Sequence, residues 1–121
     1  DLSAYYREAT DDDVTAFCES AVLAVDDPAT VLSSADSWIR AKISMIRDSK
    51  VLEINTAPQL QDKAKKFNLK YSVTKKDGQD YLVLPSNKKE LKDFLRFLDE
   101  SFFESSLTGA RFVANSKKRL G

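Results

Sequence analysis

Two short apolar segments separated by an Asp-Gly pair constrain the fold of this chain most strongly. Apolar and polar residues alternate over residues 69–73, and a second apolar run follows over residues 81–84. Between them stands Asp77-Gly78, a pair favoured in two-residue turns because these turns need positive φ angles. The pattern predicts a β-hairpin over about residues 69–84.

Helical periodicity surrounds this hairpin on both sides. Apolar residues recur at intervals of three and four, the spacing of one helix face. Helices are expected near residues 11–25, 28–47, 57–67 and 87–103. Asp27-Pro28 is a strong helix start, and Asn87 with Glu90 forms a capping box for the last helix. Residues 49–54 fit either a short strand or a further helical segment.

The fold class that follows is α+β, helix-rich, with the hairpin and a short extended segment at residues 111–113. A chain of 121 residues is one ordinary domain, so we expect residues 1–121 to form a single domain. The one methionine is Met45, so residue 1 is not a translation start. We therefore expect this to be the C-terminal domain of a longer protein.

The apolar helix faces are expected to meet in one core. The residues predicted to close it are Phe17, Leu32, Trp38, Ile39, Leu60, Phe67, Leu91, Phe94, Leu95 and Leu98. Arg40, Lys42 and Arg47 lie off the apolar stripe of their helix, and Asp99 is expected to be an ordinary surface acid. Cys18 falls on an apolar stripe and is expected to be an inert core thiol.

Several classes of chemistry are disfavoured by composition. The chain has no histidine and one cysteine, which removes the commonest general base, the commonest zinc ligand and Cys-His nucleophile pairs. Its three glycines are isolated, so no glycine-rich phosphate loop is present. The Asp11-Asp12-Asp13 triplet suits the positive end of a helix dipole, and its side chains fan out around the axis. We expect no enzyme activity, catalytic residue, cofactor or metal site.

Charge is distributed unevenly along a chain whose net charge is zero. Residues 1–37 hold nine acids and one base, whereas eighteen bases face ten acids from Trp38 onward. Such a partition indicates a basic surface that faces an anionic partner. The alternative is self-neutralisation, in which the acidic segment packs beside the basic one and nothing else binds.

Nucleic-acid binding is the function that this basic half favours. A lysine-bearing helix followed by a hairpin is loosely similar to a winged helix. Lysine side chains favour phosphate contacts over base readout, so binding should be independent of DNA sequence. The candidate nucleic-acid-binding residues are Lys63, Lys65, Lys66, Lys75, Lys76, Arg111, Asn115, Ser116, Lys117, Lys118 and Arg119. The alternative for the lysines is an ordinary solvated surface.

The end of the chain combines an apolar helix, a break and a basic tail. Leu98-Asp99-Glu100 ends the helix, Leu107-Thr108-Gly109 breaks it, Phe112 lies in an extended segment, and residues 115–120 read NSKKRL. This arrangement resembles the C-terminal end of the KwaB-like family of the Kiwa anti-phage defence system, over about the last third of the chain. Ser106 stands where that family often has proline. The tail fits either phosphate binding or a structural latch in which Leu120 fills a groove.

The resemblance implies a bacterial antiviral defence protein. Members of the family self-associate, bind DNA and work with KwaA, a small membrane protein that holds them at the inner membrane. The implied location is therefore cytoplasmic, at the membrane through that partner. No apolar run approaches the ~20 residues that cross a bilayer, so no direct insertion is expected. The rival hypothesis is a protein–protein oligomerisation module with no nucleic-acid contact.

Overall fold

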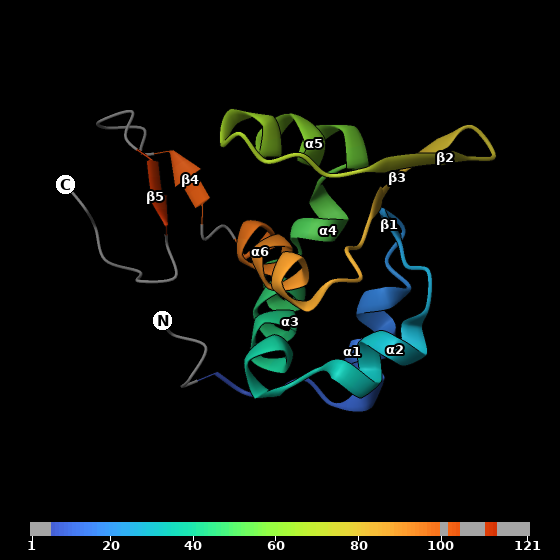
Figure 1. The fold of residues 1–121 in the computed structure, drawn as a ribbon, viewed down its shortest axis with the longest axis vertical. Helices are drawn as coiled ribbons and strands as arrows, with labels where there is room; N and C mark the ends of the chain where they lie inside the picture. The colour runs from blue at the N-terminus through green and yellow to red at the C-terminus, as the bar shows by residue number, and fades with distance from the viewer. Residues whose placement is uncertain (1–5, 100–101, 105–110, 114–121) are drawn as a thin grey trace.

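The structure is a computed structural model that describes residues 6–99, 102–104 and 111–113 (Figure 1). Helices and strands follow one another as α1 (Asp11–Cys18), β1 (Leu23–Ala24), α2 (Pro28–Ser34), α3 (Ser37–Ser49), α4 (Val51–Ile54), α5 (Ala57–Lys66), β2 (Val73–Lys76), β3 (Gln79–Val83), α6 (Lys88–Leu98), β4 (Phe102–Glu104) and β5 (Arg111–Val113). The predicted α+β class is confirmed.

The predicted hairpin is confirmed as strands β2 and β3. The strands are antiparallel, with Val73 opposite Leu82 and Lys76 opposite Gln79. Asp77 and Gly78 form the turn with φ angles of 52° and 79°. Both angles are positive, as a two-residue turn of this kind requires.

A third strand extends this sheet on the side of β3. β1 runs parallel to β3, so that the strand order is β1-β3-β2. The Leu82 and Leu84 N–H groups donate to the carbonyls of Val22 and Ala24 at 2.8 and 2.9 Å. Four helices separate β1 from the hairpin along the chain. The winged-helix comparison is not confirmed.

Three predicted helices differ from expectation, and in the first two a competing interaction interrupts the helix. The helix expected over residues 11–25 ends at Cys18, since Leu23 and Ala24 pair with β3 instead. The helix expected over 28–47 is divided into α2 and α3 at Asp36. The Asp36 carboxylate accepts from the Ile39 N–H at 2.8 Å and so caps α3.

The remaining boundaries follow local sequence chemistry closely. The Asp27 side chain caps α2 ahead of Pro28, and Asn68 has the left-handed φ of 60° expected after α5. Asn87 caps α6 by accepting from the Glu90 N–H, but the reciprocal Glu90 side-chain bond of the predicted capping box is not formed. α6 ends at Leu98 rather than at 103, because the chain becomes extended at 102–104. Residues 51–54 are helical. The predicted strand at 111–113 is confirmed as β5, paired with β4.

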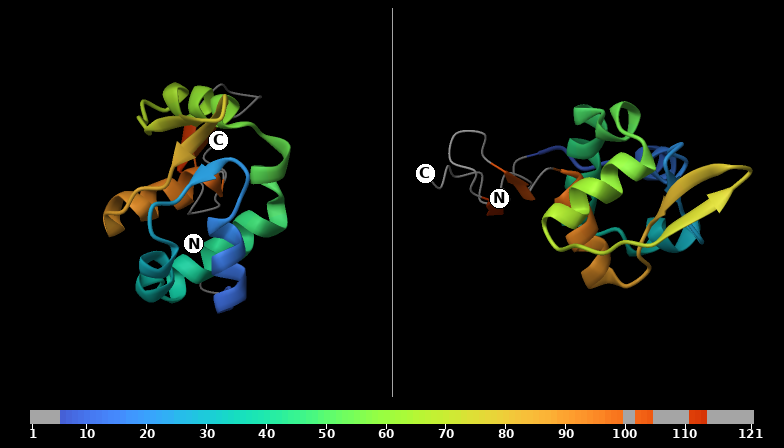
Figure 2. Two further views of the ribbon diagram at one scale, coloured as in Figure 1. Left: turned by 90° about the vertical axis from the view of Figure 1, so that its right-hand side faces the viewer. Right: turned by 90° about the horizontal axis from the view of Figure 1, so that it is seen from above.

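One apolar core connects the helices and the three-stranded sheet. α3 and α6 cross the middle of the molecule, with α5 and the hairpin to one side and α1 and α2 to the other (Figures 1 and 2). Seven of the ten predicted core residues are buried, and Leu32, Trp38 and Phe67 are half-buried. Ile43, Ile46 and Leu82 are fully enclosed as well.

The exposure predicted for two charged residues is wrong. Lys42, expected off the apolar stripe, is 0% exposed, and Asp99, expected at the surface, is 9% exposed. They lie in the centre of the molecule because their charges are paired with each other, as described below. Cys18 is buried as predicted.

Candidate nucleic-acid interface

The last turn of α5 carries three of the predicted nucleic-acid-binding residues. α5 starts at a capping box in which Thr56 and Gln59 satisfy each other's backbone N–H groups. Lys63, Lys65 and Lys66 follow at its far end, where the negative end of the helix dipole favours cations. All three are exposed, and none forms an ion pair with a residue that the structure describes.

The tip of the hairpin carries two more predicted residues, and their surroundings differ. Lys75 stands directly opposite Asp80, and its Nζ lies 3.3 Å from the Asp80 carboxylate. Lys76 stands opposite the neutral Gln79 and has no ion pair within the described part of the chain. Both lysines are exposed.

The two lysine groups belong to one layer but not to one compact patch. α5 packs on β3, and its last turn and the hairpin tip lie at opposite ends of this layer (Figure 1). Lys70 lies in the segment that joins them and is exposed, without an ion pair among residues 6–99. Sequence reasoning missed Lys70. The available signal was the alternation that begins at Leu69, which places Lys70 on the polar side of the extended segment.

The other predicted site residues cannot be assessed in the same way. Arg111 lies in β5, in register with Glu104 of β4. Asn115, Ser116, Lys117, Lys118 and Arg119 lie outside the described residues, as do the break at 107–109 and Leu120.

Self-neutralisation does occur, and it involves α3 and α6. Arg40 contacts Asp11 at 2.9 Å, and Arg47 contacts Asp13 at 2.6 Å. Asp36 receives two lysines of α6, Lys88 at 3.2 Å and Lys92 at 3.3 Å. The ion pairs that the acidic segment forms outside itself are therefore with bases of α3 and α6, and among the described residues none is with a lysine of the α5–hairpin layer.

These contacts lower the pKa of two of the carboxyl groups. Hydrogen bonds from the backbone and hydroxyl of Thr10, together with Arg47, lower the pKa of Asp13. Burial alone would raise the pKa of Asp36, but the Ile39 N–H and the two lysines outweigh it, so the pKa is lowered. Both carboxyls are held in their charged form.

A buried ion pair joins α3 to the end of α6. Lys42 donates to the Asp99 carboxylate at 2.8 Å. The Trp38 ring has three cations near it, with the charged groups of Lys42, Lys92 and Arg96 at 5.5, 5.3 and 5.0 Å from its centroid. The missed signal was spacing, since Lys42 follows the inward-facing Trp38 by four residues and must share its helix face.

Tyr71 is the clearest case of an acidity shift caused by burial. It packs edge-on against Phe94 with ring centroids 4.9 Å apart, and close to Phe97 at 5.6 Å. Burial, with the nearby Asp93 charge, raises its pKa to about 12. The hydroxyl stays protonated at neutral pH, so it does not supply an anionic base or nucleophile.

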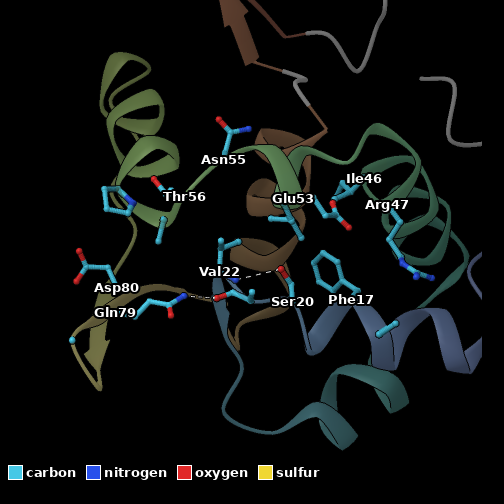
Figure 3. Close-up of a pocket in the computed structure, with 16 residues that line it drawn as sticks. Phe17, Ser20, Val22, Ile46, Arg47, Glu53, Asn55, Thr56, Gln79 and Asp80 are labelled. Atoms are coloured by element: carbon cyan, nitrogen blue, oxygen red, sulfur yellow. Dashed lines mark hydrogen bonds between the residues drawn. The ribbon is translucent and has the colours of Figure 1, made fainter.

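A cavity of about 790 Å³ opens between the end of α1, α4, the start of α5 and the hairpin (Figure 3). Apolar side chains such as Phe17, Val22 and Ile46 line it. Several of its polar groups are already engaged; for example, the Gln79 amide donates to the Ala21 carbonyl at 3.1 Å. Across the described residues, no group of three or more acids or cysteines could hold a metal ion.

Comparison with models of known protein families, with curated proteins and with solved structures gives no significant match. The similarity to the KwaB-like family stays a prediction. Within the described residues, none of the helices has the length and apolar character needed to cross a membrane.

Proposed function

We propose that this chain binds DNA through the phosphate backbone, without base preference, using the lysines of α5 and the hairpin. One observation carries the proposal. Residues 57–83 hold six lysines against three acids, and five of those lysines form no ion pair with a described residue. The acids of the first 37 residues do not supply the missing partners, because the described ion pairs of this segment are with bases of α3, α6 and its own Arg7.

The chemistry of lysine sets the kind of binding. An ammonium group on a flexible stem is attracted to phosphate as a point charge and carries little geometric information. Each phosphate that a lysine neutralises releases condensed counterions, so that affinity depends steeply on salt. The elongated placement of the two lysine groups suits a linear polyanion better than a small anion, because only a polymer reaches both.

The resemblance of the C-terminal sequence to the KwaB-like family suggests a biological role for this binding. A KwaB-like protein would use such binding in anti-phage defence, in a self-associating complex held at the inner membrane by a KwaA-type partner. The basic tail, Asn115 to Arg119, and Arg111 would add to the same polyanion-binding surface.

Fluorescence anisotropy with two short duplexes of unrelated sequence tests the proposal. The two duplexes should bind equally, and four phosphate contacts would give about a hundredfold weaker binding at 200 mM than at 50 mM salt. Replacing Lys63 and Lys66 by Gln should weaken binding and make the log–log salt slope shallower by about 1.8. The matched control, Lys88→Gln with Lys89→Gln, removes the same charge from α6 and should leave that slope unchanged.

Two results would contradict the proposal. The absence of binding at 50 mM salt would remove it, and equal losses in the test and control variants would reduce it to a net-charge effect. A strong preference between the two duplexes would show base readout and contradict the backbone mechanism.

A protein–protein assembly module is the second candidate, and Ile54 favours it. This side chain is 73% exposed and is the large hydrophobic residue left open to solvent in the described part of the chain. It ends α4 beside Glu53 and Asn55, which line the 790 Å³ cavity. Sedimentation velocity would test this module, since Ile54→Ser should shift an associating chain toward monomer, whereas the neighbouring exposed change Glu53→Gln should not.

A further inference from the structure

The hairpin places a carboxylate beside one of the two lysines at its tip. Lys75 and Asp80 are directly opposite each other across β2 and β3, and the distance from Nζ to the carboxylate oxygen is 3.3 Å. Lys76, the next residue, faces Gln79 and lacks this contact within the described residues. Both tip lysines are thus exposed, but only Lys75 forms an ion pair with a described acid.

The register of the hairpin fixes this difference. Asp77 and Gly78 both take positive φ angles, so the turn has two residues and β2 and β3 cannot slip without losing it. Asp80 is therefore held opposite Lys75 in every molecule. Its side chain is 31% exposed, about half the 66% of Lys75, so the acid is the more restricted partner.

Asp80 is also within reach of solvent on its other side. It lines the 790 Å³ cavity together with Thr56, Ala57 and Pro58 at the start of α5 (Figure 3). When Lys75 moves to a phosphate, water can hydrate the carboxylate that it leaves.

We infer that Asp80 is an internal competitor that holds Lys75 away from phosphate and so limits the affinity of the surface for nucleic acid; this inference rests on the proposed function. In the unbound protein Lys75 is already neutralised. It therefore contributes less counterion release than Lys76, and the hairpin binds as though it carried one lysine fewer.

The test is a double-mutant cycle measured by anisotropy with the same short duplexes and salt range. Asp80→Asn keeps the size of the side chain and removes its charge. It should raise affinity about twofold to fivefold, the range expected for an exposed ion pair that no longer competes. It should also steepen the log–log salt slope by up to about 0.9, one extra phosphate contact.

Two controls separate the ion pair from net charge. Asp77→Asn removes the same charge from the same hairpin, and asparagine tolerates the left-handed conformation of that position. It should raise affinity less and leave the slope unchanged. In a Lys75→Gln background, Asp80→Asn should lose its excess effect over Asp77→Asn, because the lysine that it releases is absent.

The outcomes distinguish this inference from the proposal beneath it. Suppose that the wild type binds DNA. The inference that Asp80 competes for Lys75 is then overturned if Asp80→Asn behaves like Asp77→Asn, or if it keeps its full effect in the Lys75→Gln background. In either case the proposal of DNA binding stands. If neither wild type nor Asp80→Asn binds at low salt, both are overturned.

Discussion

Lys42 in α3 and Lys66 in α5 are the same side chain in opposite surroundings. Lys42 is completely buried and donates to Asp99, whereas Lys66 is exposed and has no ion pair with a described residue. Each base of α3 forms an ion pair with an acid, and so do Lys88, Lys92 and Arg96 of α6. Around Lys66, the bases of the α5–hairpin layer outnumber their acids. Among the described residues, one group of bases thus joins the helices through ion pairs, and a second group, in the α5–hairpin layer, forms none apart from that of Lys75.

The difference shows why charge counting along a sequence gives an incomplete answer. The zero net charge of the chain conceals the basic α5–hairpin layer, because excess acids elsewhere in the sequence balance the lysines of that layer. Desolvating a charge is costly unless it is paired, so the buried bases must find acids, while the exposed bases can remain hydrated. A variant series across the two regions tests this division.

The largest effect is expected for Lys42→Met. The change keeps the length of the side chain but leaves the Asp99 carboxylate buried without its cation. Removing one partner of a buried pair costs about 3–5 kcal/mol. The unfolding free energy from urea titration measures this loss, and the fluorescence of Trp38, whose ring lies 5.5 Å from the lysine Nζ, should report the change locally.

Lys66→Met is the matched control, because it is the same substitution at the exposed position. It should change the unfolding free energy by less than about 0.5 kcal/mol. A similar loss at both positions would contradict the division between a paired centre and an exposed layer.

Asp36→Ala should have an intermediate effect. The Asp36 carboxylate caps α3 and also receives Lys88 and Lys92, so it joins the acidic segment to α6. Loss of the cap costs about 0.5–2 kcal/mol, and the half-exposed ion pairs add little. Asp36→Ser retains a capping oxygen without the charge and should recover most of the loss. Failure of this recovery would show that the ion pairs, and not the cap, matter.

A smaller effect is expected from acid. The pKa values of Asp13 and Asp36 are lowered in the folded state, so the unfolded chain binds protons at higher pH than the folded one. Their contribution to stability is complete above the unfolded pKa near 4 and is lost as pH falls through the lower folded values. Urea titrations between about pH 5 and pH 2 should show this loss, and the double variant Asp13→Asn with Asp36→Asn should show a shallower dependence. A pH dependence unchanged in that variant would exclude these carboxyls as its source.

The smallest effect is expected from Cys18. Burial raises the pKa of its thiol, so little thiolate forms at neutral pH. Alkylation by a maleimide in native buffer should be slow, and it should become fast in denaturing urea. Rapid labelling of the native protein would show that the end of α1 opens readily.

Local sequence chemistry was sufficient wherever a structural feature depends on a few neighbouring residues. The Asp77-Gly78 turn, the Asp27 cap before Pro28 and the left-handed Asn68 were all predicted, because each is decided by backbone angles or a short-range hydrogen bond. The exposure of Lys63, Lys65 and Lys66 also followed from helical periodicity alone.

The tertiary structure decided everything that depends on partners distant in sequence. α1 ends at Cys18 because β1 pairs with a strand near residue 82, and α2 is separated from α3 by an Asp36 cap that α6 reinforces. Lys42 is buried because Asp99, fifty-seven residues later, meets it at 2.8 Å. A charge can be buried in a core only when a counterion is buried beside it, and a local sequence pattern does not specify a counterion that is distant in sequence.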